Sequence, residues 1–550
     1  MPSFRFHIPN FFSRQETNGA LYQYHEVAAD ETSNLVHSHQ DQGDDLLHPG
    51  TGAESTQAWK HLCRKRRALV YLTFGLLGMG VLLPFNSIIT PSEYFRSSFS
   101  HTSFSSTFSS WIIVSYNVVS ILFGLHATAT GGLEKSSPRR RIIVSSLFII
   151  FALFTMALST TVHLSSSGGE VRTHPTLYFY FTLANGFVLS TATAYLQNAV
   201  VALSTAFGGN GSFIGCMLAG QGIVGVGISI FGLGSAWSQA RGPNGGEVGA
   251  RAISPSLLAT ETQSPETLNE IYRAATLFFF MTMALMSFVL AVFVWLAKSD
   301  LYGEVMQKQV KEEDLESDSD VDDHEHHHHH PLSSSSHLDR DSLLHKVPGF
   351  HSLSPKNRAS LLTLASVQSL IKWDCFAIAY IFIVTLSVFP TLTSLIQSVH
   401  TTSNAHVLRS LASPLLFVPF HFLLFNVSDL LGRTLPSVAA RLAQIQSVKA
   451  LVGLALARTV FVPLFMGCNV SNKVVVVADG NAGILRSSDL PFFALVLLFG
   501  LSNGLISTSV MIVGPSRAGD QAPLAATLLS FWLCIGLAIG SGLSFFTVGR

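Results

Sequence analysis

Long apolar runs separated by short polar segments dominate the chain. Several runs contain no Asp, Glu, Lys or Arg, and each is longer than the ~20 residues that a helix needs to cross the hydrocarbon core of a bilayer. They are residues 68–92, 142–169, 274–297 and 522–548, together with 173–240, which is long enough for two helices. A helix satisfies its backbone hydrogen bonds within one segment, as lipid requires. The pattern therefore predicts an all-helical, polytopic membrane protein.

Further runs with few charged residues raise the expected number of transmembrane helices to eleven. They are residues 108–130, 361–396, 411–440, 451–467 and 492–513. Composition agrees, because only 12% of the residues are charged, whereas about 25% is usual in soluble proteins. A long polar segment separates the sixth run from the seventh. We therefore expect two helical bundles packed face to face, one of six helices at residues 61–297 and one of five at residues 361–550.

Two polar segments contain too few large aliphatic residues to bury a core of their own. Residues 1–60 are rich in Ser, His, Gln, Gly and Asp, and we expect a disordered tail there. Residues 298–360 carry an acidic run and then a histidine run, and we expect a disordered loop. Short loops rich in Lys and Arg face the cytosol. Basic residues at 64–67 and 139–141 lie on one side of the membrane in this topology, so both polar segments are predicted to be cytosolic.

The histidine run at residues 326–330 allows two interpretations. Imidazoles bind zinc, nickel and copper, so a metal-ion transporter has to be weighed. A disordered loop of low complexity, with no ligand, is the alternative. We favour the loop, because no predicted membrane helix carries the cluster of His, Asp and Glu side chains that a metal pathway needs. No metal site is therefore expected in the membrane region.

The run at 411–440 contains charged residues inside an otherwise apolar helix. Asp429 and Arg433 are four residues apart, and Asn426 precedes Asp429 by three, so the three side chains share one helix face. A charge at mid-bilayer costs roughly 2.5–3.5 kcal/mol on insertion scales and normally faces the protein interior. We interpret this face as the candidate binding site. The alternative is an internal ion pair that only holds the helix in place.

Two other predicted helices carry side chains suited to ligand binding. In the first helix, Phe85 and Asn86 follow Pro84, which puts a flat ring, an amide and a freed backbone carbonyl at one depth. The ring could lie against a nucleobase or a sugar face; a kink with an interhelical hydrogen bond is the alternative. In the fourth helix, Gln197 can donate and accept together, which suits a nucleobase edge. An interhelical hydrogen bond is again the alternative.

Catalytic motifs are missing from the sequence. We find no catalytic constellation and no phosphate-binding Gly-Lys-Ser/Thr loop. The sequence therefore favours a carrier over an enzyme or an ATP-driven pump, and it indicates no cofactor and no nucleic-acid partner. Transport would be driven by the substrate gradient or by a coupled proton. Asp374 and Glu93 are candidate proton-coupling carboxylates, and for both the alternative is an interfacial charge.

Several motifs follow one another along the membrane region in a characteristic order. Residues 80–86 fit the pattern Gly-x-Leu-Leu-Pro-aromatic-Asn. The eighth predicted helix fits Phe-Asn-x-x-Asp-x-x-Gly-Arg at Phe425, Asn426, Asp429, Gly432 and Arg433. Shorter matches lie at residues 220–222, 389–390, 458–463, 502–504 and 514–515. In these motifs the chain resembles the equilibrative nucleoside transporters, a family also called solute carrier family 29.

The resemblance implies an eleven-helix, two-bundle carrier, similar to the major facilitator fold, that works by alternating access. Its substrates would be nucleosides, with nucleobases as a further class. In that family the eighth-helix Asp and Arg engage the ribose and a fourth-helix Gln lies near the base, which carries over to Asp429, Arg433 and Gln197. Phe85 stands where many members have Trp, so base preference does not carry over. A carrier of sugars or other small polar solutes is the alternative.

A short segment of the predicted cytosolic loop resembles an acidic dileucine sorting signal. It consists of Asp339, Leu343 and Leu344 with the residues between them. Such a signal would be read by clathrin-adaptor complexes, and family members that carry one are often lysosomal or vacuolar. We therefore favour a vacuolar or lysosomal membrane over the plasma membrane. The expected partners are a nucleoside substrate, the lipid bilayer and these adaptors.

Overall fold

The computed structural model describes a chain made of helices. The described residues are 57–99, 102, 108–133, 138–165, 175–208, 211–240, 265–308, 355–399, 413–438, 445–468 and 488–548. Their elements are α-helices and short 3-10 helices. The fold class predicted from the hydrophobic pattern, all-α, is confirmed for this part of the chain.

Six long helices make up the first half of the described chain. They are α3 (Arg64–Ile89), α5 (Phe108–Leu133), α6 (Pro138–Ser165), α7 (Pro175–Ala206), α8 (Ser212–Ala240) and α9 (Pro265–Ala297). Two short helices flank α3, namely α2 (Gln57–His61) and α4 (Ser92–Ser98). These six helices correspond to the six apolar runs that precede the long polar segment.

The second half contains more interruptions. Its α-helices are α12 (Pro355–Leu370), α13 (Lys372–Val388), α15 (Pro414–Val438), α17 (Val448–Ala457), α18 (Phe461–Met466), α20 (Asp489–Ser516) and α21 (Ala522–Val548). Three 3-10 helices lie between them: η2 (Thr393–Leu395), η3 (Arg458–Val460) and η4 (Gly519–Gln521). Together α17, η3 and α18 form one continuous membrane-length segment. Pro463 explains the 3-10 turn in its middle, because proline lacks an N–H and its ring crowds the carbonyl four residues earlier.

Ten described helical segments are long and apolar enough to cross a membrane, by length and composition. They correspond to ten of the eleven helices that the sequence predicts. The remaining predicted helix is α15, which is 25 residues long but is not among the ten. Asn426, Asp429 and Arg433 all lie in α15 and reduce its hydropathy. The count of eleven transmembrane helices therefore stays a prediction.

The predicted helix at 361–396 differs from the structure. The run is divided into α12 and α13, because Ile371 has a non-helical backbone conformation, with φ −101° and ψ 16°. The division coincides with Lys372 and Asp374, whose charges interrupt the apolar run and lie in the first turn of α13. The prediction of one helix there is therefore wrong. The far end is also earlier than expected, since α13 ends at Val388, before Phe389 and Pro390.

Both predicted disordered segments are too long, since α2 begins at Gln57 within the predicted tail at 1–60, and α12 begins at Pro355 within the predicted loop at 298–360. The loop also begins later than expected. Residues 300–308 form a helix. Leu301, Tyr302 and Val305 are buried and share one face of this helix, so it packs like a core element. Glu304 accepts a hydrogen bond from the backbone N–H of Ala58 at 3.1 Å, which ties this helix to α2.

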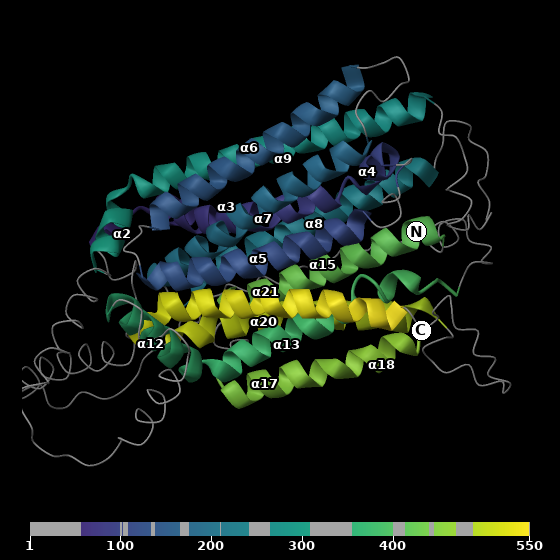
Figure 1. The fold of residues 1–550 in the computed structure, drawn as a ribbon. Helices are drawn as coiled ribbons and strands as arrows, with labels where there is room; N and C mark the ends of the chain where they lie inside the picture. Colours follow the sequence, from purple (N-terminus) through teal and green to yellow (C-terminus); the bar gives the residue numbers. More distant parts are fainter. Residues whose placement is uncertain are drawn as a thin grey trace, which may run out of the picture. The chain divides into compact units, whose positions relative to one another are not determined.

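Several helices of one half pack against helices of the other. In the first half α3 packs against α8 and α9, and α6 packs against α7 and α9; in the second half α15 packs on α20 and α13 on α21. Across the halves, α8 lies beside α15, and α21 lies beside α5 and α7 (Figure 1). Polar side chains on these helices can therefore take part in a site that is shared by both halves.

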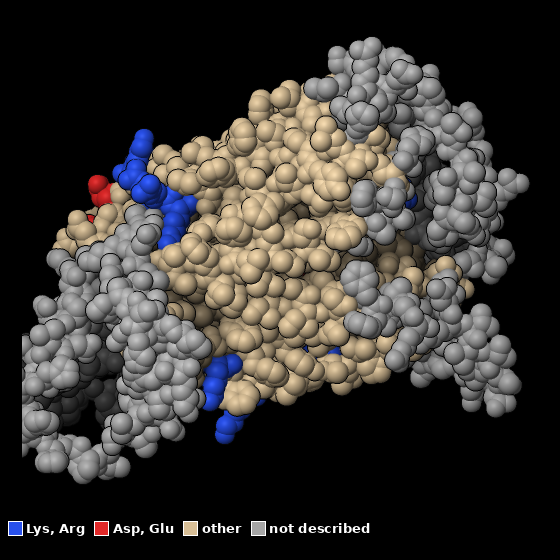
Figure 2. Space-filling model, in the orientation of Figure 1, with Lys and Arg blue, Asp and Glu red and all other residues tan. Residues whose placement is uncertain are grey.

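Charged residues gather at the ends of the helices. On the face drawn in Figure 2, Lys and Arg lie mainly at the end where α2 is found in Figure 1, and the broad middle carries other residue types. The exposed basic residues include Arg64, Lys65 and Arg66 at the start of α3, and Arg139 and Arg140 near the start of α6. This distribution is the one expected where basic residues face the cytosol.

Candidate functional site

Glycine brings α15 and α20 into backbone contact. A Cβ atom at Gly504 would collide with the backbone oxygen of Asp429 and would lie 2.7 Å from the backbone nitrogen of Arg433. A Cβ at Gly432 would likewise meet the backbone of α20. Small residues permit such close helix packing in membranes. The contact places Asn503, the neighbour of Gly504, next to Asp429.

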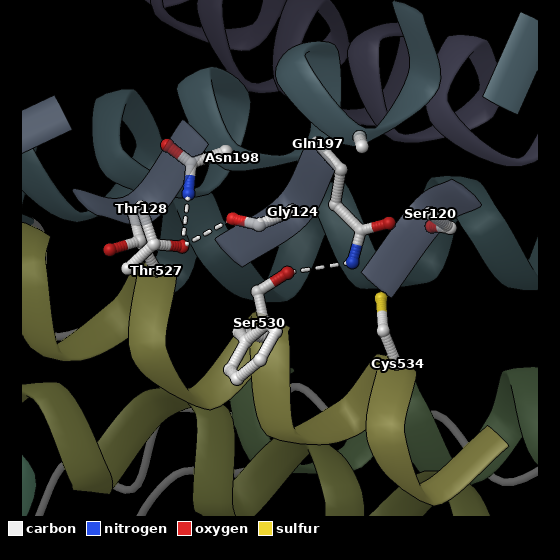
Figure 3. Close-up of a pocket in the computed structure, with 10 residues that line it drawn as sticks. Ser120, Gly124, Thr128, Gln197, Asn198, Thr527, Ser530 and Cys534 are labelled. Atoms are coloured by element: carbon white, nitrogen blue, oxygen red, sulfur yellow. Dashed lines mark hydrogen bonds between the residues drawn. The ribbon is translucent and has the colours of Figure 1, made fainter. Parts of the chain in front are cut away.

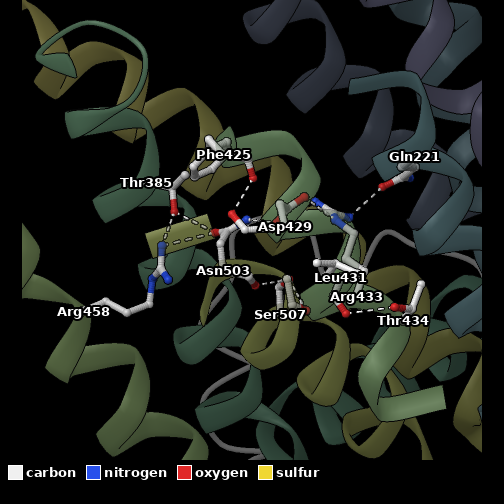
Figure 4. Close-up of polar contacts among 12 residues, drawn as sticks. Gln221, Thr385, Phe425, Asp429, Leu431, Arg433, Thr434, Arg458, Asn503 and Ser507 are labelled. Carbon is white, nitrogen blue, oxygen red and sulfur yellow. Dashed lines mark hydrogen bonds and ion pairs between the residues drawn. The ribbon is translucent and has the colours of Figure 1, made fainter. Parts of the chain in front are cut away.

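The Asp429 carboxylate is buried and accepts hydrogen bonds from two sides (Figure 4). Arg433 Nε donates to Oδ2 at 2.7 Å, and Asn503 Nδ2 donates to Oδ1 at 2.7 Å. The side chains of Asp429 and Arg433 are only 7% and 11% exposed. The two charges therefore share one helix face, as predicted, and they form the ion pair that was the alternative to a binding site. Asn503 is the partner that the helix-face argument did not include.

The same face of α15 also contacts the other half of the protein. Arg433 NH1 donates to Oε1 of Gln221 on α8 at 3.5 Å. Asn426 Nδ2 donates to Oγ of Ser229, also on α8, at 2.8 Å. The three side chains predicted from the 411–440 run therefore lie where α15 meets α8. A ligand at this place would touch both halves.

A buried arginine lies behind Asn503. Arg458, on η3, is 2% exposed, and its guanidinium donates to Thr385 Oγ1 at 2.9 Å and to Asn503 Oδ1 at 3.4 Å. It also donates to the Phe499 carbonyl at 3.0 Å and to Ser502. Arg458 belongs to one of the matched motifs, but no role for it was predicted from the sequence. A charged residue within a predicted membrane run was the signal that could have identified it.

Gln197 lies in a separate polar cluster between α7, α5 and α21 (Figure 3). Its Nε2 donates to Ser530 Oγ on α21 at 2.6 Å, and the neighbouring Asn198 donates to Thr128 on α5 at 2.9 Å. The cavity that these side chains line has space for about one water molecule. In this conformation Gln197 therefore joins the halves directly. Among the described residues, no hydrogen bond links it to Asp429 or Arg433.

Phe85 and Asn86 lie within the packing of the first half. The Phe85 ring packs against Tyr116, with 5.0 Å between ring centroids, and the Asn86 amide donates to the backbone oxygen of Leu82 at 3.0 Å. The Asn86 amide therefore bonds within its own helix, α3. The structure thus brings Asp429, Arg433 and Asn426 together, and leaves Gln197, Phe85 and Asn86 in other surroundings.

The candidate proton-coupling residues are not part of this cluster. Asp374 is buried and forms an ion pair with Arg517, and Arg517 also donates to the backbone oxygen of Gln446 at 2.6 Å. This ion pair ties the start of α13 to the end of α20. Glu93 lies in α4, but its side chain is outside the described part of the chain. The sorting-signal residues and the histidine run are also outside the described residues.

The fold and the site together define a class. Membrane-length helices in two halves, with a buried ion pair and hydrogen-bonding side chains where the halves meet, are the features of a multi-pass membrane carrier. The family model described as "Nucleoside transporter" matches residues 255–548, which is more than half of the chain. The chain therefore belongs to the nucleoside transporter family.

The chain is similar to known transporters over different lengths. The chain is 27% identical over 504 residues to equilibrative nucleoside transporter 2 of Rattus norvegicus, covering 87% of this chain and 96% of the relative. It is 33% identical over 209 residues to equilibrative nucleoside transporter 1 of Mus musculus, covering 36% and 41%. Among solved structures, the E. coli fucose:proton symporter FucP is similar at a TM-score of 0.46 and 16% identity, covering 88% of this chain and 91% of that one.

Proposed function

We propose that this protein carries nucleosides across its membrane by alternating access, and that the ribose binds at Asp429 and Arg433. The observation that carries the proposal is the buried ion pair on α15, which lies where the halves meet and reaches Gln221 of the opposite half. Membership of the nucleoside transporter family supports the substrate class. A site shared by two halves is what an alternating-access carrier needs.

The chemistry of the pair suits a ribose. A carboxylate has about four lone-pair sites and a guanidinium has five N–H donors. Within the described chain, Asp429 accepts two hydrogen bonds and Arg433 donates two, so both groups retain capacity for a ligand. Two vicinal hydroxyls can donate to the carboxylate while their oxygens accept from the guanidinium. Such charge-assisted hydrogen bonds are roughly twice as strong as neutral ones.

The contacts of α8 support a conformation that is closed at one end. Gly225 and Gly220 in the first part of α8 approach Asn426 and the backbone of Gly75 closely. Gly227 and Gly232 lie two turns further along α8, on the same faces as Gly220 and Gly225 respectively. A Cβ at either position would meet no described atom within 4 Å. The close packing on α15 and α3 therefore ends along α8. In the predicted orientation the closed end is cytosolic.

We assign the base to Gln197, with Phe85 and Asn86 as further residues on that side. Gln197 offers an amide edge from α7, which packs against both α3 and α21. Its present partner, Ser530, belongs to the opposite half. In this proposal the Gln197 amide exchanges that partner for the base when the halves separate. Phe85 and Asn86 contribute from α3, one helix away.

The proposal includes transport down a nucleoside gradient, with or without a coupled proton, in a vacuolar or lysosomal membrane. Asp339, Leu343 and Leu344 are proposed to direct the protein there through clathrin-adaptor complexes. A fluorescent fusion in which both leucines are replaced by alanine should move to the plasma membrane. Unchanged vacuolar or lysosomal location of that variant would remove the signal from the proposal.

Uptake by purified protein in lipid vesicles tests the proposed function. Wild-type protein should take up radiolabelled uridine and adenosine, and an excess of unlabelled nucleoside should compete better than free ribose. Asp429→Asn and Arg433→Ala should each abolish this uptake. Ser428→Ala is the matched control, because Ser428 is a buried neighbour on α15 whose hydroxyl, among the described residues, bonds only the carbonyl of Phe425. Normal uptake by both charge variants would eliminate this site.

The same vesicles distinguish gradient-driven from proton-coupled transport. Uptake at pH 5.5 and 7.5 on the substrate side should be compared with and without a proton ionophore. A rate that depends on the proton gradient, and not on the pH itself, would indicate coupling. Competition by ribose as strong as competition by uridine would instead favour a sugar carrier.

A further inference from the structure

We propose that Asn503 and Arg458 are positioning residues that hold the Asp429 carboxylate in its ribose-binding orientation. The inference rests on the proposed function of Asp429 and extends the site by one layer. It assigns a task to a buried cation on η3 and to an amide on α20, neither of which is proposed to touch the substrate.

The two ends of the Asn503 amide face different groups. Its Nδ2 donates to Asp429 Oδ1 at 2.7 Å, and its Oδ1 accepts from Arg458 at 3.4 Å. Thr385 Oγ1 lies 2.7 Å from the same Oδ1 and also accepts from Arg458 at 2.9 Å (Figure 4). An amide turned by 180° would point its NH2 group at the guanidinium and its oxygen at the carboxylate. Arg458 and Thr385 therefore permit one orientation, in which Asn503 donates to Asp429.

Arg458 is held without a carboxylate of its own. No described carboxylate lies within 4.0 Å of its guanidinium, since the ion pairs among described residues are Arg433 with Asp429 and Arg517 with Asp374. The guanidinium instead lies over the ring of Phe499, 4.5 Å from the centroid, and donates to neutral oxygens. A buried charge that served only stability could be replaced by apolar packing at little cost. Its connection to Asp429 through Asn503 gives the charge a role in the site.

The arrangement also explains how Asp429 can change partners. Arg433 holds Oδ2 from the same helix, whereas Asn503 holds Oδ1 from α20. When Arg433 turns toward a ribose, the Asn503 bond remains and keeps the carboxylate from rotating. Gly504, next to Asn503, fixes the spacing of α20 from α15, because its Cβ position is occupied by the α15 backbone. Asn503 and Gly504 on α20, together with Arg458 on η3, thus hold the Asp429 carboxylate in place.

Asn503→Asp is the most direct test. It places a second carboxylate against Asp429, and the other groups that face Asp429 are Arg433 on its own helix and Arg458 behind position 503. At pH 8 both carboxylates would be charged and would repel, so Asp429 should rotate and the KM for uridine should rise at least tenfold. At pH 5.5 the pair can share a proton as an O–H···O⁻ bond, and the KM should return to within about threefold of wild type.

The readout must separate positioning from folding. Uridine should therefore be compared with 2′,3′-dideoxyuridine, which lacks the vicinal 2′ and 3′ hydroxyls that are proposed to donate to Asp429. At pH 8, Asn503→Asp and Arg458→Gln should abolish the preference for uridine over the dideoxynucleoside, while uptake of the dideoxynucleoside at saturating concentration changes less than threefold. Arg458→Lys should recover part of the preference, because a lysine keeps the charge but has no planar fork. All values are normalised to the amount of protein in the vesicles.

Matched controls make the outcomes decisive. Asn185→Asp buries a carboxylate in α7, where the partners of the amide within the described chain are Thr155 and the Phe181 carbonyl, so it should not change substrate preference at either pH. A retained uridine preference in Asn503→Asp and Arg458→Gln, with normal uptake by wild type, would overturn the inference and leave the proposed function intact. Absence of nucleoside uptake by wild type would overturn the proposed function itself. If Arg458→Gln fails to fold, Asn503→Asp still decides the question.

Discussion

Gly504→Ala tests the contact on which the whole site depends. The added methyl group would lie 2.7 Å from the backbone nitrogen of Arg433 and closer still to the backbone oxygen of Asp429. Ordinary contact begins at 3.4 Å, so α20 must move away from α15 by at least ~0.7 Å, and the opposing atoms cannot yield because they are backbone. The Asn503–Asp429 hydrogen bond, now 2.7 Å, would lengthen to ~3.4 Å, beyond the usual range.

The expected effect is a loss of both stability and substrate affinity. Overpacking of this kind costs about 1–3 kcal/mol, and for a protein of this size that corresponds to a fall of about 1–3 °C in apparent melting temperature, because the entropy of unfolding grows with chain length. The assay is thermal unfolding of the purified protein in detergent, followed by the KM for uridine in vesicles. Gly453→Ala on α17 is the matched control, because a Cβ there meets no described atom within 4 Å. Equal melting temperatures and KM values for wild type and both variants would refute the reasoning.

Two further predictions concern contacts outside the α15–α20 crossing. Asp374→Asn removes the ion pair with Arg517 and should lower the melting temperature while leaving the pH profile of uptake unchanged; a lost proton dependence would instead make Asp374 a coupling residue. Asn426→Ala removes the 2.8 Å bond to Ser229 and should change the uptake rate by about two- to tenfold, because a hydrogen bond between the halves stabilises one conformation by ~0.5–1.5 kcal/mol. Ser229→Ala should have the same effect, and the double variant no more; additive effects would show that the bond is not the cause.

The break between α12 and α13 could be predicted from the sequence only in part. Charged residues near the middle of the 361–396 run were visible in the sequence, and the structure divides the run beside them, at Ile371. The sequence placed Asp374 at a membrane boundary but did not identify Arg517 as its partner. Arg517 lies 143 positions away along the chain, so no spacing rule relates the two. Such pairs depend on which helix ends are brought together.

The residues of the site that lie on one helix were predicted, and those that lie on other helices were missed. Asp429, Arg433 and Asn426 lie on one helix, and a helix has a fixed period, so their common face could be read from the sequence. Asn503 contacts Asp429 from α20, and Arg458 on η3 contacts Asn503; the polar character of these two residues does not show in the sequence which way their side chains face. Gln197 was predicted as part of the same site, yet the structure pairs it with Ser530 on α21.

The sequence by itself determined the membrane class, the helical content and the charged face of α15. Each of these depends on composition or on the periodicity of one segment, and both are local properties of the chain. Only the tertiary structure decided that α20 lies in backbone contact with α15, that Asn503 is turned toward Asp429, and that α8 supplies Gln221 and Ser229 from the other half. These contacts join residues 74 to 212 positions apart. They are fixed by how helices pack around their glycines, and no single segment contains that information.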